Sequence, residues 1–201
     1  MLSALLIFFV APVAAANPCT NGSFEAVAPD GRPVDWEILN QGEIITTDAH
    51  TGKRALRLVR VADDPIPETG LNRRWQPRSG EQGAMIDRLG GGIEFWYKAV
   101  AATHSNLHIQ VIPMDETAFE TGPYRAEFTV PTAHVGDGAW HRGRLKYDYS
   151  AYPEVKWVHF AARILGGAGE MLLDDFAYVE TVGPILEVVG LRFEECEDAP
   201  G

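Results

Sequence analysis

The sequence predicts an all-β domain, and three observations support this prediction. Short segments that are apolar, or that alternate apolar with polar residues, recur along the chain at the spacing typical of a β-sandwich. Glycine and proline separate these segments, as in PRSGEQG, RLGGG, VGDGA and LGGAG. No long stretch has helical periodicity, and no internal repeat is visible. We therefore expect a sandwich of two antiparallel sheets.

The clearest expected strands cover residues 54–61, 92–100, 106–114, 126–131, 140–149, 155–165 and 170–180. In the first of them, alternation directs Leu56 and Leu58 to the core and Arg57 and Val59 to the other face. The segment 155–165 also fits one face of a helix. We predict a strand there, because aromatic and β-branched residues dominate its first half and GGAG follows it.

Composition limits the kinds of partner. The chain has 201 residues, which suggests one domain with short appendages, and 46% of them are hydrophobic. Its formal net charge of −11 argues against nucleic acid, anionic lipid and polyanionic substrates, because the summed field would repel them. Neutral ligands and cations stay compatible with this charge.

Both ends of the chain differ from the expected domain. Residues 1–16 carry no charged side chain, and Ala14-Ala15-Ala16 fits a small-x-small cleavage site, so we expect a secretory signal peptide and a secreted, extracellular or periplasmic protein. This stretch lacks the usual Lys or Arg, and an ordinary buried apolar segment is the alternative. The domain is expected over 17–183. Residues 184–201 follow a Gly-Pro break and indicate a linker, a truncated start of a following region or an extra strand.

The two cysteines, Cys19 and Cys196, lie near opposite ends of the mature chain. In an oxidising compartment they could form one disulfide, which requires the termini to meet. Two separate thiols are the alternative.

Sequence motifs for catalysis are missing. The chain has no phosphate-binding loop, no HExxH and no Cys-x-x-Cys. His104 and His108 are four residues apart, which on a strand does not bring two ligands to one metal, so we interpret them as surface or groove histidines. We therefore expect that this protein is not an enzyme.

Three segments, in order, resemble the jelly-roll carbohydrate-binding modules of families 4, 9 and 22. They are NGSFEAVAPDGRPVDWEI at 21–38, TDAHTGKRALRL at 47–58 and MLLDDFAYVE at 171–180. The first resembles the opening Asn-Gly-x-Phe-Glu strand of those modules, with a Trp at the start of the next strand. The second resembles their acid-x-His-Ser-Gly-Lys turn, with Thr51 in place of Ser, and the third resembles their closing Asp-Asp strand. The resemblance implies a jelly-roll β-sandwich.

The resemblance also implies a structural Ca²⁺. Carried over to this sequence, its ligands are Glu25, Asp48, the carbonyl of Lys53, and Asp174 or Asp175. Several carboxylates with turn carbonyls suit Ca²⁺, and an acid in an apolar strand is costly to bury without a partner. We favour Asp174, because strict alternation gives it the face of Phe176. Solvated acids, or ion pairs with Lys53 or Arg54, are the alternative.

Glycan sites on sandwiches combine aromatic faces with planar polar groups. The candidates are Arg73 and Trp75, with Arg74 beside them, and His108 and Gln110 on the strand 106–114. Tyr124 with Arg125 is a weaker set. For other aromatic residues we expect no ligand role. Trp96 and Trp140 are expected in the core, and Tyr147, Tyr149 and Tyr152 on a solvent-facing edge.

We therefore expect a secreted, non-catalytic module that binds a polysaccharide or oligosaccharide, with neutral glycans favoured by the net charge. A jelly-roll domain with a structural or protein-contact role is the main alternative, since a fold does not fix a function. A polysaccharide lyase or hydrolase is a further alternative that needs a Tyr–His–Arg cluster in a groove.

Overall fold

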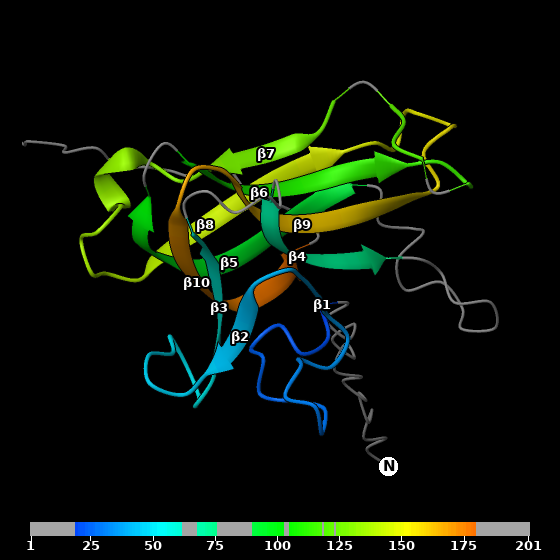
Figure 1. Ribbon diagram of the computed structural model, residues 1–201. Helices are drawn as coiled ribbons and strands as arrows, with labels where there is room; N and C mark the ends of the chain where they lie inside the picture. The colour runs from blue at the N-terminus through cyan, green and yellow to red at the C-terminus, as the bar shows by residue number, and fades with distance from the viewer. Residues whose placement is uncertain are drawn as a thin grey trace, which may run out of the picture.

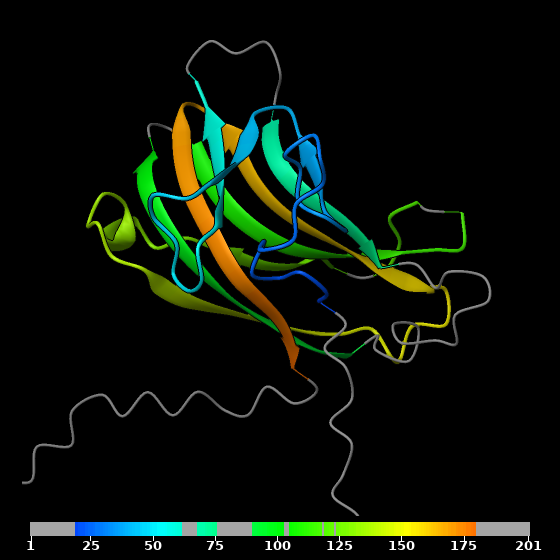
Figure 2. The same cartoon turned by 90° about the horizontal axis from the view of Figure 1, so that it is seen from below.

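The computed structural model describes residues 19–61, 68–75, 90–102, 105–117, 119–122 and 124–179. Two antiparallel five-stranded sheets lie face to face (Figures 1 and 2), with the strand orders β1-β4-β9-β6-β7 and β2-β3-β10-β5-β8. The predicted all-β sandwich is confirmed. The expected signal peptide and Cys196 lie outside the described residues, and so do the C-terminal segment and His104. Within the described ranges, no helix is long and apolar enough to span a bilayer.

The strands of the first sheet are β1 (Glu37–Leu39), β4 (Glu68–Trp75), β9 (Trp157–Gly166), β6 (Ser105–Met114) and β7 (Ala126–Thr129). Those of the second are β2 (Gly42–Ile45), β3 (Ala55–Arg60), β10 (Gly169–Val179), β5 (Gly90–Ala102) and β8 (His141–Asp148). A 3-10 turn, η2 (Thr132–His134), follows β7. The segment 155–165 is a strand, as predicted.

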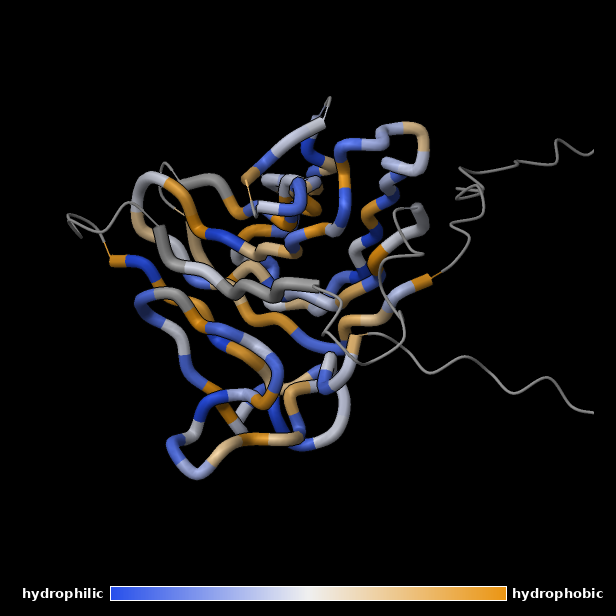
Figure 3. The backbone as a smooth tube through the Cα atoms, turned by 90° about the vertical axis from the view of Figure 1, so that its right-hand side faces the viewer, coloured by the Kyte–Doolittle hydropathy of each residue, from blue (hydrophilic) through white to orange (hydrophobic). Residues whose placement is uncertain are grey.

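Alternation along the strands (Figure 3) builds the core between the sheets. Leu56 and Leu58 are fully buried, as expected from the sequence. An aromatic cluster fills the centre, where the rings of Phe160 and Phe176 have centroids 5.0 Å apart. Phe24 and Trp36 join this cluster at 5.5 Å from each other. The first and last described segments of the chain therefore share one core.

The opening Asn-Gly motif is a turn rather than the expected strand. Asn21 adopts a positive φ of 52°, and its side-chain amide donates to the carbonyls of Ala26 and Val34, each at 2.8 Å. Gly22 lies against β10, where a Cβ would come within 2.0 Å of the Phe176 carbonyl oxygen. The motif is required for this local geometry.

Two tyrosines expected at a solvent-facing edge are buried, so that prediction is wrong. Tyr147 is 1% exposed and Tyr149 is fully buried, because the inward phase of β8 includes Leu145 and continues through both. The hydroxyl of Tyr149 donates to the Val111 carbonyl and accepts from the Ala126 amide, both at 3.0 Å. These hydrogen bonds satisfy the buried polar group. Tyr152 is half-buried and packs against the core.

Candidate functional site

The turn that precedes β3 covers the end of β10 and buries Asp174. The carboxylate of Asp174 has no exposed surface, and its Oδ2 accepts from the amides of His50 at 3.0 Å and Thr51 at 3.2 Å. Its Oδ1 accepts from the Asp175 amide at 2.8 Å. Burial outweighs these hydrogen bonds and raises the pKa of Asp174 to about 6. Of the Asp174–Asp175 pair, Asp174 is the buried acid.

The reason for this burial differs from the expected one. The pairing of β10 with β5 shifts register between Asp174 and Ala177, and Asp175 has a positive φ of 50°. This bulge breaks the alternation, so that Asp174 lies beneath the turn while Phe176 points into the core. Asp175 lies closer to solvent and contacts His50 Nδ1 at 2.7 Å.

Trp96 and Trp140 are not core residues, so that prediction is also wrong. Both are half-buried, and the His50 ring stacks on Trp96 with a centroid distance of 3.7 Å. Trp96 pairs with Asp174 on β10, so it lies on the outward face of the second sheet. The indole Nε1 of Trp140 donates to Asp48 Oδ1 at 3.0 Å. Residues of the turn 47–54 thus cover part of both indole rings.

Glu25 binds the far end of the same turn. Its Oε1 accepts from the amides of Lys53 at 2.7 Å and Arg54 at 2.9 Å. The Lys53 hydrogen bond, with further help from Arg54, lowers the pKa of Glu25. Gly52, at φ +64°, is necessary here, because a Cβ would come within 2.4 Å of Glu25 Oε1.

The structure brings together some of the predicted metal ligands. Glu25 and Lys53 meet at one end of the turn, and Asp174 meets its other end through His50 and Thr51. Asp48 is engaged elsewhere, with Lys98 Nζ at 2.8 Å, and this hydrogen bond lowers its pKa. Within the described part of the chain, no three His, Cys, Asp or Glu side chains are close enough to hold a metal. A cation at this turn would therefore depend on backbone carbonyl oxygens.

The outward side of β6 and β9 forms a second candidate surface, which we call the β6–β9 face. The register aligns His108 with Arg163 and Gln110 with Ala161. Further along the strands, Ile112, Met114, Trp157 and Ala161 form an apolar cluster separate from the main core. Trp157 and Arg163 were missed in the sequence, although the alternation of 155–165 places them on one side.

Gln110 is the most unusual group of this face. Its side chain is 4% exposed, yet its Oε1 has no hydrogen-bond partner in the described structure. The neighbouring His108 contacts Glu127 through Nδ1, and its Nε2 also has no partner among the described residues. Burial lowers the pKa of His108, which keeps the ring neutral at neutral pH. Two predicted ligand-binding residues thus lie side by side with unused hydrogen-bonding capacity.

The other two predicted ligand-binding residues lie on β4. The register pairs Arg73 with Phe160 and Trp75 with Val158, two core residues of β9. On β4, the positions that align with residues of the β6–β9 face are instead Asn72 and Arg74, which pair with Ala161 and His159. The side chains of Arg73 and Trp75 lie outside what the structure describes. Tyr124, of the weaker set, is 47% exposed and donates to the Asp148 carbonyl, and Arg125 pairs with Glu120.

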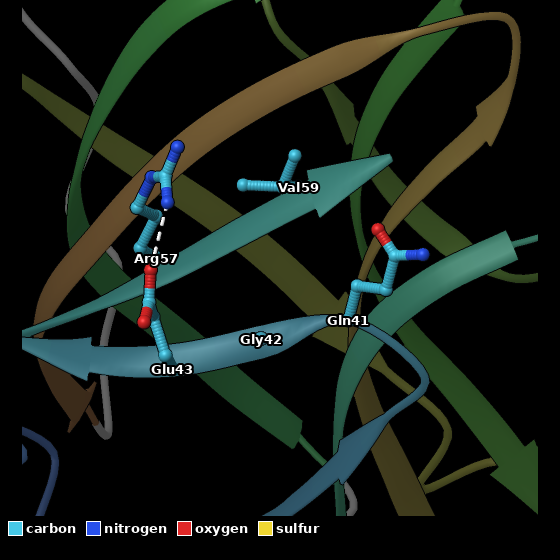
Figure 4. Close-up of a pocket in the computed structure, with 5 residues that line it drawn as sticks. All are labelled: Gln41, Gly42, Glu43, Arg57 and Val59. Carbon is cyan, nitrogen blue, oxygen red and sulfur yellow. Dashed lines mark hydrogen bonds and ion pairs between the residues drawn. The ribbon is translucent and has the colours of Figure 1, made fainter. Parts of the chain in front are cut away.

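A shallow groove crosses the outward face of the second sheet, and we call it the Arg57 groove. It consists of two adjoining hollows of about 330 and 450 Å³ that share Glu43 and Arg57. Figure 4 shows the residues that line the smaller hollow. Arg57 donates to Glu43 Oε1 at 2.7 Å and to Glu170 Oε1 at 2.8 Å. No local sequence pattern predicts this groove, because its residues come from β2, β3, β5 and β10.

Comparison with solved structures identifies the fold. TmCBM61, solved in complex with β-1,4-galactotriose, is similar with a TM-score of 0.53 at 15% identity, over 83% of this chain and 100% of that chain. The CBM22-1 xylan-binding domain of Paenibacillus barcinonensis Xyn10C gives 0.50 at 15% identity, over 80% and 94%. This chain has the jelly-roll fold of carbohydrate-binding modules. The sequence matches no protein-family profile and no curated protein.

The same jelly roll also occurs within a larger enzyme. The enzymatically active domain of tailspike protein 4 from bacteriophage CBA120 is similar with a TM-score of 0.53 at 11% identity. The match covers 82% of this chain but 21% of the tailspike chain. At these identities the likeness concerns the fold, so function has to be argued from the surfaces.

Proposed function

We propose that this protein is a non-catalytic glycan-binding module that binds neutral sugar chains on the β6–β9 face. The observation that carries the proposal is the buried, unpartnered Oε1 of Gln110 beside the unpartnered Nε2 of His108. Leaving a buried acceptor unsatisfied costs about 1–3 kcal/mol. A sugar hydroxyl can donate to either atom, so binding would recover this cost.

The surroundings of these two atoms support a sugar as the ligand. Arg163 on β9 pairs with His108 and adds planar donors, and Glu127 on β7 contacts the other side of His108 and adds carboxylate acceptors. Ile112 and Met114, which are 4% and 8% exposed, continue the same side of the strands as part of a buried apolar cluster. The jelly-roll fold, shared with modules solved with galactotriose or described as xylan-binding, agrees with this proposal.

Affinity electrophoresis on immobilised galactan, xylan and mixed-linked β-glucan tests the proposal. Wild-type protein is expected to be retarded by at least one of them. Gln110→Ala should weaken that binding about tenfold or more, which corresponds to about 1.4 kcal/mol. Arg142→Ala is the control, because Arg142 is exposed on the opposite sheet. Retardation by no glycan would support the protein-contact alternative instead.

We further propose a structural Ca²⁺ at the turn 47–54, held mainly by carbonyl oxygens of the turn, among them that of Lys53, together with Glu25 and Asp174 from its two ends. The buried carboxylate of Asp174 and its raised pKa support this, because a bound cation would stabilise the ionised form. Calcium should raise the melting temperature, and a chelator should lower it, with a larger effect at pH 7 than at pH 5. No response at either pH would exclude the ion.

Secretion is part of the same proposal. A glycan-binding module acts where polysaccharides are, and the expected signal peptide at 1–16 would export it. Expression of the full chain in a secreting host, followed by N-terminal sequencing, is expected to give Asn17 as the first residue. An intact Met1 on the accumulated protein would contradict export.

A further inference from the structure

We propose that the Arg57 groove is a second saccharide site, on the sheet opposite the β6–β9 face. The groove crosses β2, β3, β10 and β5, and its two hollows join at Glu43 and Arg57. Its larger hollow, about 450 Å³, lies within the usual range for small-ligand sites of about 300–1,000 Å³.

Charged groups of opposite sign alternate along this groove. Glu43, Arg57 and Glu170 form one connected series, and Lys98 pairs with Asp48 beside it. Arg57 uses Nε and one NH1 hydrogen for its two carboxylates, so part of its guanidinium can still donate. Glu43 keeps a second oxygen, and its side chain is 59% exposed. The series thus offers donors from Arg57 at its centre and acceptors from the carboxylates at its two ends.

The base of the groove is apolar. Val59 and Leu172 lie between the charged residues, with Ile45 and Val100 further along. An apolar base bordered by fixed donors and acceptors matches a sugar ring, whose C–H groups contact the base while its hydroxyls bond at the rim. The ion pairs already hold the charged side chains in place, so binding requires little additional ordering.

Other occupants fit less well. A metal ion would face the positive charges of Arg57 and Lys98, which already neutralise the carboxylates. An anionic ligand would meet Glu43, Asp48 and Glu170 together on a protein of net charge −11. A neutral polyol avoids both penalties, because its hydroxyls donate to carboxylates and accept from the guanidinium. The groove lining contains no aromatic residue, so we expect weak affinity, with Kd on the order of 1 mM.

Nuclear magnetic resonance can observe the two faces separately in one sample. The Arg57 Nε–H and the Gln41 side-chain amide report on the groove, and the Gln110 side-chain amide reports on the β6–β9 face. Titration with galactotriose, xylotriose and cellotriose is expected to shift both sets, with different midpoints. Trigalacturonate, the charged counterpart, should leave the groove signals unmoved.

Variants make the assignment decisive. Arg57→Met and Lys98→Met should each abolish the saccharide-induced shift at Gln41 while the Gln110 shift persists. Arg142→Met, which removes an ion pair with Glu94 on the same sheet, is the matched control and should change neither. Shifts at Gln110 without any at Arg57 or Gln41 would overturn the second site and leave the proposed function standing. Shifts in the groove alone would do the opposite, and shifts at neither face with any trisaccharide would overturn both. Groove shifts as large with trigalacturonate would overturn the neutral ligand.

Discussion

The two outer faces of this sandwich differ in how their polar groups are satisfied. On the β6–β9 face, Gln110 is almost fully buried and its carbonyl oxygen has no partner among the described residues. On the opposite sheet, Arg57 and Lys98 are each paired with carboxylates at 2.7–2.8 Å, and Asp174 accepts three amides. The unsatisfied oxygen of Gln110 therefore lowers the free energy of unfolding, and a ligand that donates a hydrogen bond to it can restore that stability. In the Arg57 groove the charged groups are already paired without a ligand, so a ligand there gains only contacts with the apolar base and hydrogen bonds at the rim.

The largest expected effect concerns the contribution of the turn 47–54 to the free energy of unfolding. Gly52→Ala places a methyl group at a positive φ and against Glu25, so the free energy of unfolding should fall by about 2–3 kcal/mol. Gly31→Ala is the control, because Gly31 has φ +83° and nothing within 4 Å of an added Cβ. It should cost about 1–2 kcal/mol from backbone strain alone. Equal losses in urea denaturation would show that the Glu25 contact does not matter.

The next effect is the pH dependence contributed by Asp174. Its pKa is about 6 in the folded state against an ordinary value of 3.8, so between about pH 4 and 6 the folded protein keeps a proton that the unfolded chain releases. Raising the pH through this window should therefore lower the free energy of unfolding, on the order of 1–3 kcal/mol without calcium. The lowered pKa values of Glu25 and Asp48 act in the opposite direction, at lower pH.

Comparison with Asp174→Asn isolates this contribution. Unfolding free energies of both proteins, measured by urea denaturation from pH 4 to pH 7 in chelator, should converge or cross as the pH rises. If the two curves stay parallel, Asp174 does not titrate in this window. Calcium, if bound, should remove the wild-type decline.

A smaller effect tests whether Gln110 is a cost to the fold. Gln110→Met replaces an amide whose oxygen has no partner in the described structure by an apolar side chain of similar length, so stability should stay constant or rise by up to about 1 kcal/mol. Tyr149→Phe is the contrast, because the Tyr149 hydroxyl makes two hydrogen bonds and its loss should destabilise by about 1 kcal/mol. A clear loss of stability in Gln110→Met would mean that Gln110 is already satisfied.

The smallest effect is expected at the Arg57 groove. Arg57→Met breaks two ion pairs in which all side chains are partly exposed, so the free energy of unfolding should fall by less than about 1 kcal/mol. The difference should shrink further in high salt, because screening weakens exposed charge pairs. Thermal unfolding at low and high salt measures this. A loss well above 1 kcal/mol would make the groove part of the structural framework.

Most of the fold could be predicted from the sequence, but less of the surface could. Alternation placed Leu56 and Leu58 in the core, because one face of a strand is a local property of the chain. The prediction failed for Tyr147 and Tyr149. Charged residues alternate with these tyrosines and suggested an exposed edge, although the tyrosines themselves point inward. Trp96 was misplaced because a distant turn, and not its own strand, covers it.

The candidate sites differ in the same way, because one lies on a single strand and the other is built from several strands. His108 and Gln110 are two residues apart on one strand, so the sequence could predict that they lie together. Arg57, Glu43 and Glu170 come from three strands, and their meeting depends on pairing that no local pattern encodes. The bulge at Asp175 likewise depends on the register between β10 and β5.

That bulge makes β10 a strand with two phases. Before it, odd-numbered residues such as Leu173 point to the core, and after it the even-numbered Phe176 does. Asp174 and Phe176 are two residues apart, yet they lie on opposite faces, where regular alternation would place them on the same face. Deleting Asp175 would restore regular alternation with Asp174 still outward and Phe176 still inward, and would remove the carboxylate that contacts His50 and Thr51. The extra residue therefore adds a second carboxylate to the contact with the turn without moving the first carboxylate or the ring.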